Sequence, residues 1–177
     1  MLTPDEQHRS PEDHVVFLSL GSNLGDRRRQ LQRALDLLSQ QMTIEQISSV
    51  YDTAPMLVTE QPRFLNLVCR ARTALSPHDV LALLKSTEQQ MGRTAGIRYG
   101  PRVIDIDLLF YDALVLDTPS LTLPHPRIAE RAFVLLPLAE IAPAFVHPAL
   151  NRTVADLAQQ VAEADVQPMG PLFSSTG

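Results

Sequence analysis

The chain has 177 residues, 45% of them hydrophobic, which fits one globular domain with its own core. The formal net charge is −5, so a general basic face for nucleic-acid binding is not expected. No apolar stretch reaches the ~18 residues of a membrane span, and the acidic start lacks a signal-peptide pattern. Cys69 is the single cysteine and is interpreted as a small core residue. We expect a cytoplasmic monomer without nucleic-acid or membrane partners.

Four strands are predicted from short apolar runs that end at Gly, Pro or Asp turns. The run from Phe64 to Thr73 alternates most clearly, with Leu65, Leu67 and Cys69 on one side of the strand. The predicted strands cover residues 15–20, 44–51, 64–73 and 103–111.

Two helices are predicted between these strands. A turn over residues 21–26 leads into the first, where apolar residues recur at helical spacing from Leu31 to Leu38. The second begins with Ser76 as N-cap and Pro77 as first helical residue, and it ends at Gly92. Residues 127–163 are expected to be mostly helical and interrupted by prolines.

The order β-α-β-β-α-β predicts an α+β fold. We expect a ferredoxin-like antiparallel sheet with helices packed on one face and a helical C-terminal extension. Residues 14–165 are expected to form a single domain, with loose termini at residues 1–13 and 166–177.

The strongest chemical signal is the pair Asp105 and Asp107 in the last predicted strand. Side chains alternate along a strand, so the two carboxylates share one face, roughly 6–7 Å apart. They repel each other unless a cation lies between them, and Mg²⁺ suits such a site. The alternative is a solvated sheet face on which acids cost nothing. The opposite, apolar face is predicted to carry Ile104, Ile106, Leu108 and Phe110.

Basic residues near this strand indicate a polyphosphate ligand. Arg93, Arg98 and Arg102 lie in the loop that enters the strand, and the arginine fork matches phosphate oxygens. His125, between two prolines, and Arg131 are candidates for the same phosphate site. The alternatives are a solvated basic loop and a structural histidine.

A flat heterocycle with donors and acceptors at its edge is a second candidate ligand. Asn66 offers both a donor and an acceptor, and Thr53 precedes it on a neighbouring loop. Apolar or aromatic side chains would have to wall such a ring. The candidate wall residues are Phe64, Tyr99 and Phe133.

Together these residues resemble one known family, the 6-hydroxymethyl-7,8-dihydropterin pyrophosphokinases of folate biosynthesis. The resemblance runs from about Val15 to about Pro143. Its most specific part is Gly100-Pro101-Arg102, two residues, then Asp105-Ile106-Asp107, with Pro124-His125 downstream. Other matching segments are Leu20-Gly21-Ser22-Asn23-Leu24-Gly25-Asp26, Ser48-Ser49-Val50-Tyr51, Gln61-Pro62, Phe64-Leu65-Asn66, Gly92-Arg93 and Arg131-Ala132-Phe133.

The resemblance implies a role for each matching residue. Asp105 and Asp107 would bind two Mg²⁺ ions that bridge the phosphates of ATP, and with Arg93 and Arg98 they would be the catalytic residues. The residues implied in ATP binding are Glu88, Arg93, Arg98, Arg102, Leu121, Thr122, His125 and Arg131. The residues implied in pterin binding are Gly21, Thr53, Ala54, Met56, Phe64, Asn66, Tyr99 and Phe133.

The reaction implied is in-line attack of the pterin hydroxymethyl oxygen on the β-phosphorus of ATP, with AMP leaving. No side chain has to act as a general base, because such transfer depends mainly on positioning and charge stabilisation. One alternative is another metal-dependent transferase, such as a nucleotidyl- or glycosyltransferase. A second is a small-molecule binding module, since fold alone does not fix function.

Overall fold

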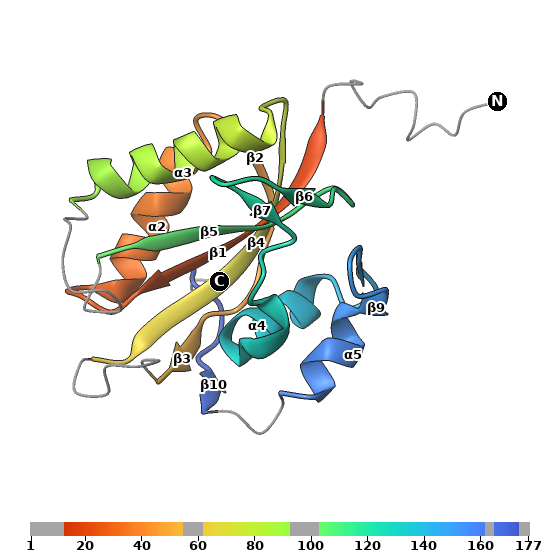
Figure 1. Ribbon diagram of the computed structural model, residues 1–177. Coiled ribbons are helices and arrows are strands. Elements are labelled where there is room, and N and C mark those ends of the chain that lie inside the picture. Colours follow the sequence, from red (N-terminus) through yellow and green to blue (C-terminus); the bar gives the residue numbers. More distant parts are fainter. Residues whose placement is uncertain (1–12, 55–61, 93–102, 162–164, 174–177) are drawn as a thin grey trace.

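A computed structural model describes residues 13–54, 62–92, 103–161 and 165–173. An antiparallel sheet in the order β10-β3-β4-β1-β5 forms the centre, and β2 also pairs with β4 (Figure 1). The fold is therefore α+β, as the sequence predicts. The strands of this sheet are β1 (His14–Ser22), β2 (Thr43–Ile47), β3 (Tyr51–Thr53), β4 (Phe64–Thr73), β5 (Asp105–Tyr111) and β10 (Val166–Pro168).

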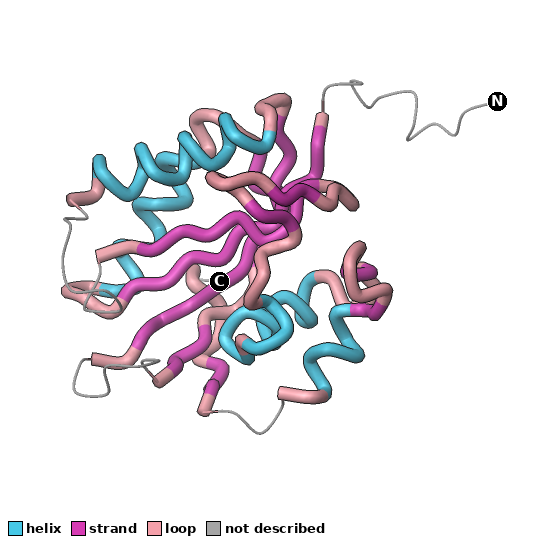
Figure 2. Tube along the Cα trace, viewed as in Figure 1, coloured by secondary structure: helices cyan, strands magenta, loops and turns pink. Residues whose placement is uncertain are grey.

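Helices and two small hairpins surround the sheet (Figure 2). The helices are α2 (Arg27–Leu38), α3 (Pro77–Gln90), α4 (Ala132–Ile141) and α5 (Val154–Gln159), with a short 3-10 helix η1 (Ile128–Glu130). The hairpins pair β6 (Leu116–Asp117) with β7 (Thr122–Leu123), and β8 (Val146–His147) with β9 (Arg152–Thr153). Within the part of the chain that the structure describes, no helix is long and apolar enough to cross a membrane.

Helices cover both faces of the sheet, whereas the sequence predicted one covered face. Leu18 and Leu67 belong to the core beneath α2 and α3. Phe17 and Val68, their neighbours in sequence, belong to a second core with α4 and α5. The difference has a simple cause, because β1 and β4 are apolar on both sides and each face needs a cover.

The predicted starts of both helices are confirmed. The Asp26 side chain accepts from the Arg29 N–H at the start of α2. Ser76 accepts from the Asp79 N–H at the start of α3, with Pro77 in its first turn. These caps fix where each chain segment leaves the sheet.

The predicted strand over residues 44–51 is divided in two. β2 ends at Ile47 and β3 begins at Tyr51, with a bend between them. In the bend Ser48 donates its N–H to the Val68 carbonyl at 2.9 Å, and its hydroxyl accepts from the Val68 N–H at 3.0 Å. The serine hydroxyl thus replaces a backbone carbonyl as the acceptor for the Val68 N–H, which lets the chain change direction here.

Phe110 lies on the opposite face from the one predicted. The pairing of β1 with β5 shifts between Phe17 and Leu18, so that Phe17 faces Phe110 and Leu18 faces Leu108. Leu109 is the extra residue of this bulge, and side-chain alternation reverses after it. Phe110 therefore packs in the core under α4 and α5, while Ile106 and Leu108 stay in the core under α2 and α3.

The C-terminal part is less helical than predicted. The β8–β9 hairpin separates α4 from α5, so helix does not fill residues 127–163. Residues 166–168, expected to be loose, form β10 at the edge of the sheet. The central sheet therefore includes residues beyond the expected domain limit at 165.

Candidate active site

Pairing between three neighbouring strands brings the candidate residues together on one face of the sheet. In β1, Gly21 lies opposite Asn66 of β4 on one side and Asp105 of β5 on the other. Two residues earlier, Ser19 lies opposite Val68 and Asp107. Since alternate residues share a face, Asn66, Asp105 and Asp107 all point toward the layer that holds α4.

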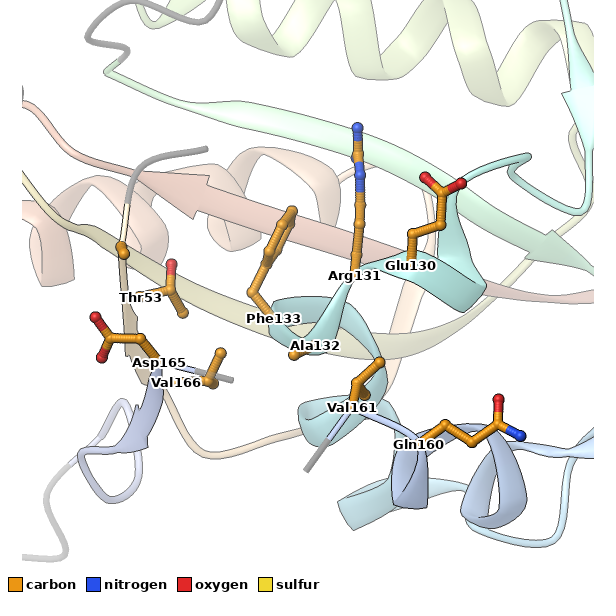
Figure 3. A pocket seen from close by; sticks show the side chains of 10 residues that line it. Thr53, Glu130, Arg131, Ala132, Phe133, Gln160, Val161, Asp165 and Val166 are labelled. Atoms are coloured by element: carbon orange, nitrogen blue, oxygen red, sulfur yellow. The ribbon is translucent and has the colours of Figure 1, made fainter. Parts of the chain in front are cut away.

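The two aspartates are half-buried, and Asp107 lies next to an arginine that is itself largely shielded from solvent. Asp107 has a side chain 31% exposed, and its Oδ2 lies 3.8 Å from Nη1 of Arg131, which is only 13% exposed. Arg131 is the N-cap residue of α4 and extends from it toward β5 (Figure 3). Arg131 therefore lies beside the acidic strand, and its phosphate-binding role stays a prediction.

Glu140 anchors α4, the helix that supplies Arg131 and Phe133. Its carboxylate accepts from the Ser49 N–H and from the Tyr51 hydroxyl, the latter at 3.0 Å. Burial and this carboxylate raise the pKa of Tyr51 to about 12, so the hydroxyl remains a donor at neutral pH. The bend between β2 and β3 is thereby tied to α4.

The candidate heterocycle site is centred on Asn66. Its Nδ2 donates to Thr53 Oγ1 at 2.6 Å, and both side chains are buried. A Cβ atom on Gly21 would collide with Asn66 Oδ1, so only glycine leaves room for the amide in this position. Because one N–H is used by Thr53, the rest of the amide is presented in a fixed orientation.

A cavity of about 430 Å³ adjoins this site between β3, β10 and the start of α4 (Figure 3). Thr53, Ala54, Arg131 and Phe133 line it, and the Arg131 guanidinium lies 5.5 Å from the centre of the Phe133 ring. Phe133 thus places an aromatic ring at this cavity, and its role as a wall for a pterin ring stays a prediction. Sequence reasoning missed the other lining residues, Glu130, Ala132, Gln160, Val161, Asp165 and Val166.

A second cavity, of about 310 Å³, is lined by Asp107. Its lining includes Leu121, Thr122 and His125, which were predicted to bind the nucleotide. Lys85 and Ser120 also line it and were not predicted. Lys85 lies on the exposed side of α3, and a lysine at that helical position gives no sequence signal beyond an ordinary solvated face.

His125 is oriented by the backbone around it. The backbone N–H of His125 donates to the Leu109 carbonyl at 3.0 Å. The ring Nδ1 accepts from the backbone N–H of Arg127 at 3.2 Å. Burial, followed by the charges of Arg131 and Arg127, lowers the pKa of His125 to about 4, against a smaller opposing effect of Asp105. The ring is neutral at pH 7, with its proton on Nε2 as a donor.

Acid should weaken the fold through His125. In the unfolded chain the imidazole takes up a proton near pH 6.5, whereas in the folded chain it does so near pH 4. Stability is therefore unaffected above pH 6.5 and falls as the pH drops from 6.5 to 4, by up to about 3 kcal/mol. We expect His125→Gln to lose less stability over this interval, measured by urea unfolding without divalent metal. Equal losses in both proteins would contradict the expectation.

Glu88 lies beneath the acidic strand. It is 1% exposed on α3, and its Oε1 accepts from the Ile106 N–H at 3.3 Å. Ile106 is the residue between the two aspartates, so this contact holds the strand segment that presents them. Glu88 was predicted to lie near the nucleotide, and that role stays a prediction beside the contact with β5.

Five predicted site residues lie outside the described residues: Met56, Arg93, Arg98, Tyr99 and Arg102. Gly100 and Pro101 of the family motif lie outside them as well. The described site thus contains Gly21, Thr53, Ala54, Phe64, Asn66, Glu88, Asp105, Asp107, Leu121, Thr122, His125, Arg131 and Phe133.

The donor set of the described site fits Mg²⁺ held partly by a substrate. Across residues 13–54, 62–92, 103–161 and 165–173, no group of three or more His, Cys, Asp or Glu forms a closed metal site. Two half-buried carboxylates on one face match the magnesium sites in which substrate phosphates and water supply the remaining ligands.

An α+β sheet whose face presents two carboxylates beside an arginine and a neutral histidine has the features of a phosphoryl- or diphosphoryl-transfer domain. The chain belongs to the 7,8-dihydro-6-hydroxymethylpterin-pyrophosphokinase family, whose sequence model matches residues 17–143.

Similar proteins agree with this assignment. The folate synthesis bifunctional protein of Pisum sativum is 50% identical over 131 residues, or 73% of this chain. The 2-amino-4-hydroxy-6-hydroxymethyldihydropteridine pyrophosphokinase of Bacillus subtilis is 41% identical over 131 residues, again 73% of this chain. The chain spans 25% of the pea protein and 78% of the bacterial one.

A solved structure shows the same fold. The crystal structure of Plasmodium falciparum HPPK-DHPS A437G with SDX-DHP superposes with a TM-score of 0.70 at 16% identity. The superposition covers 86% of this chain and 46% of that one.

Proposed function

We propose that this chain transfers the diphosphate of ATP to 6-hydroxymethyl-7,8-dihydropterin in folate synthesis, with AMP as the second product. One observation carries the proposal: pairing across three strands sets Asn66, Gly21 and Asp105 in one row. The Asn66 amide, which suits the edge of a pterin, lies on β4. The Asp105 carboxylate, which suits a metal bound to phosphate, lies on β5, and only β1 separates these two strands. Family membership and the name of the B. subtilis relative support the same reaction.

The two substrates are assigned to two separate places near Asp107 and Arg131. ATP is assigned to the cavity lined by Leu121, Thr122 and His125, where the Nε2 proton of His125 can be donated to a phosphate. The pterin is assigned to Asn66 and Thr53, with Phe64 and Phe133 as walls. Asp107 and Arg131 lie between the two assignments, where the transferred diphosphate has to pass.

In the proposed reaction the pterin hydroxymethyl oxygen forms a bond to the β-phosphorus and releases its proton to water. The bond from that phosphorus to the bridging oxygen of AMP breaks. Arg131 stabilises the charge on the diphosphate, and its low exposure keeps water from weakening this interaction. Arg93, Arg98 and Arg102 are predicted to bind the same phosphates. Asp105 and Asp107 are predicted to hold two Mg²⁺ ions, which when bound would neutralise phosphate charge.

The finer structural and cellular predictions belong to the same proposal. The order β3-β4-β1-β5, with α2 and α3 on one face, supports a ferredoxin-like core to which α4, α5 and β10 are added. A cytoplasmic location, a monomeric state and the lack of nucleic-acid or membrane partners stay predictions from composition.

Incubation with ATP, MgCl₂ and 6-hydroxymethyl-7,8-dihydropterin tests the proposal. We expect AMP and pterin diphosphate in equal amounts, and neither product when EDTA replaces the metal. Formation of ADP, or ATP consumption that does not need the pterin, would contradict it. A nucleotide bound without turnover would favour the binding-module alternative.

Gly21→Ala should damage pterin use more than ATP use. The new Cβ would meet Asn66 Oδ1, so the amide must shift away from the position fixed by Thr53. We expect kcat/KM for the pterin to fall about 100-fold, the effect of a displacement near 1 Å, with the KM for ATP within about twofold. Steady-state kinetics with each substrate varied in turn checks this. An equal loss for both substrates would show that the sheet itself is disturbed.

A further inference from the structure

The residues from 165 to 172 form a strap along the edge of the sheet, next to the proposed pterin site. β10 pairs with β3 so that Val166 lies opposite Thr53 and Pro168 opposite Tyr51. Beyond β10 the Met169 N–H donates to the Val50 carbonyl at 2.8 Å, and the Val50 N–H donates to the Gly170 carbonyl at 2.9 Å. The strap begins 22 residues after the family match ends at residue 143.

Side chains attach the strap at both ends. Arg28 of α2 donates to the carbonyls of Met169 and Pro171 at 3.0 and 3.1 Å. Leu172 is 4% exposed and belongs to the core under α2 and α3. At the other end Asp165 accepts from both terminal nitrogens of Arg63, at 2.9 and 3.1 Å.

Arg63 links this end of the strap to both pterin strands. It pairs with Asp52, whose side chain also lies 3.5 Å from Arg27. Asp52 directly precedes Thr53 in β3, and Arg63 directly precedes Phe64 in β4. The pair with Arg63 lowers the pKa of Asp165, as an ion pair does. The ion pairs of Asp165 and Arg63 thus end at residues next in sequence to Thr53 and Phe64.

β3 depends on such support because it is only three residues long. A typical strand has five or six residues, and a short edge strand is easily displaced. With β10 in place, β3 has a paired neighbour on each side, β4 and β10. Thr53 then holds the Asn66 amide at 2.6 Å, while Asp165 and Val166 close the cavity that Thr53 and Phe133 also line (Figure 3).

We propose that the strap is a positioning element for the pterin site, and that Asp165 acts on Thr53 and Asn66 through Arg63. This inference rests on the proposed function, because the ligand it positions is the pterin. Among the described residues, the cavity assigned to ATP around His125 has no lining residue from the strap, so we expect the effect on the pterin to be the larger one.

The test is a double variant of the full chain, Asp165→Ala with Arg28→Ala, which removes the side-chain ties and keeps Leu172 and the backbone pairing. We expect faster hydrogen exchange at the Met169 amide. We also expect a KM for the pterin about tenfold higher, with kcat and the KM for ATP within about twofold; this is smaller than the ~100-fold effect of a 1 Å misplacement. Asp165→Glu with Arg28 intact should restore the wild-type KM, because the ion pair can form again.

The matched control is Asp36→Ala with Arg29→Ala, which removes the same two residue types from exposed positions of α2. It should leave the exchange at Met169 and both KM values unchanged. The proposal is overturned if the Asp165 and Arg28 variant keeps the wild-type KM for the pterin, whether or not exchange at Met169 rises, or if both KM values rise together. A wild-type chain that does not convert the pterin would instead refute the proposed function.

Discussion

Replacing Asp107 or Asp105 by asparagine is expected to reduce turnover by at least about 1,000-fold. Asparagine keeps the size of the side chain but removes the charge that balances a metal cation, and a preorganised charged group in such sites is worth 100- to 1,000-fold by itself. The fold should persist, because both side chains are half-buried at the face of an edge strand. Release of AMP under saturating Mg-ATP and pterin measures the effect.

Asp36→Asn is the control for this experiment, since Asp36 is an exposed residue of α2 away from the sheet face. It should retain wild-type turnover. The thermal midpoints of both site variants should match wild type in EDTA. Turnover within tenfold of wild type for either site variant would contradict the assigned role of the two carboxylates.

Replacing Arg131 by methionine is expected to lower kcat about 100-fold or more. Methionine keeps much of the buried volume but removes the charge that lies 3.8 Å from Asp107 and against the Phe133 ring. The same change should raise the pKa of His125, because the Arg131 charge is one of the causes that lower it. The pH dependence of stability would then move toward that of a free imidazole.

Two readouts separate this role from a structural one. NMR titration of the His125 ring should show the higher pKa, and rapid-quench kinetics should show slower product formation on the enzyme. Arg152→Met in the β9 hairpin is the control, as that side chain is exposed. A wild-type kcat in Arg131→Met would show that the charge between the two cavities is not needed.

The sequence predicts those parts of the fold that local chemistry decides. Ser76 and Pro77 mark the start of α3, because the Ser76 side chain caps an N–H group of the first turn and Pro77 suits the first helical position. The start of α2 follows from the turn predicted over residues 21–26. The limits of β4 follow from its alternating residues. The face shared by Asp105 and Asp107 follows from the same rule.

The sequence does not predict features that depend on how distant segments pair. Phe110 changes face because Leu109 is an extra residue in the pairing with β1, and nothing local marks that bulge. β10 is only three residues long and mostly exposed, so its sequence carries no strand pattern. It becomes a strand because β3 offers backbone groups that β4 leaves unpaired. The roles of Arg28 and Arg63 likewise depend on partners more than 100 residues away in the chain.

Within the candidate site, residue types with a specific chemistry were predicted, and residues with common roles were missed. Asn66, His125 and Arg131 each carry a hydrogen-bond donor that suits a ligand. Their positions were also informative, because Asn66 lies on an apolar strand and His125 between two prolines. Lys85 lines its cavity from the exposed side of α3, Gln160 from the end of α5 and Asp165 from the strap, and a polar side chain is expected at such positions in any protein. Only the assembled sheet distinguishes them from an ordinary surface.

The most direct test of the proposed reaction uses ATP labelled with ³²P at the β-phosphate, together with Mg²⁺ and the pterin. The label should appear wholly in the pterin diphosphate, with unlabelled AMP beside it, and Asp107→Asn should form neither. Label recovered in ADP, or in free diphosphate released without a pterin product, would contradict the account.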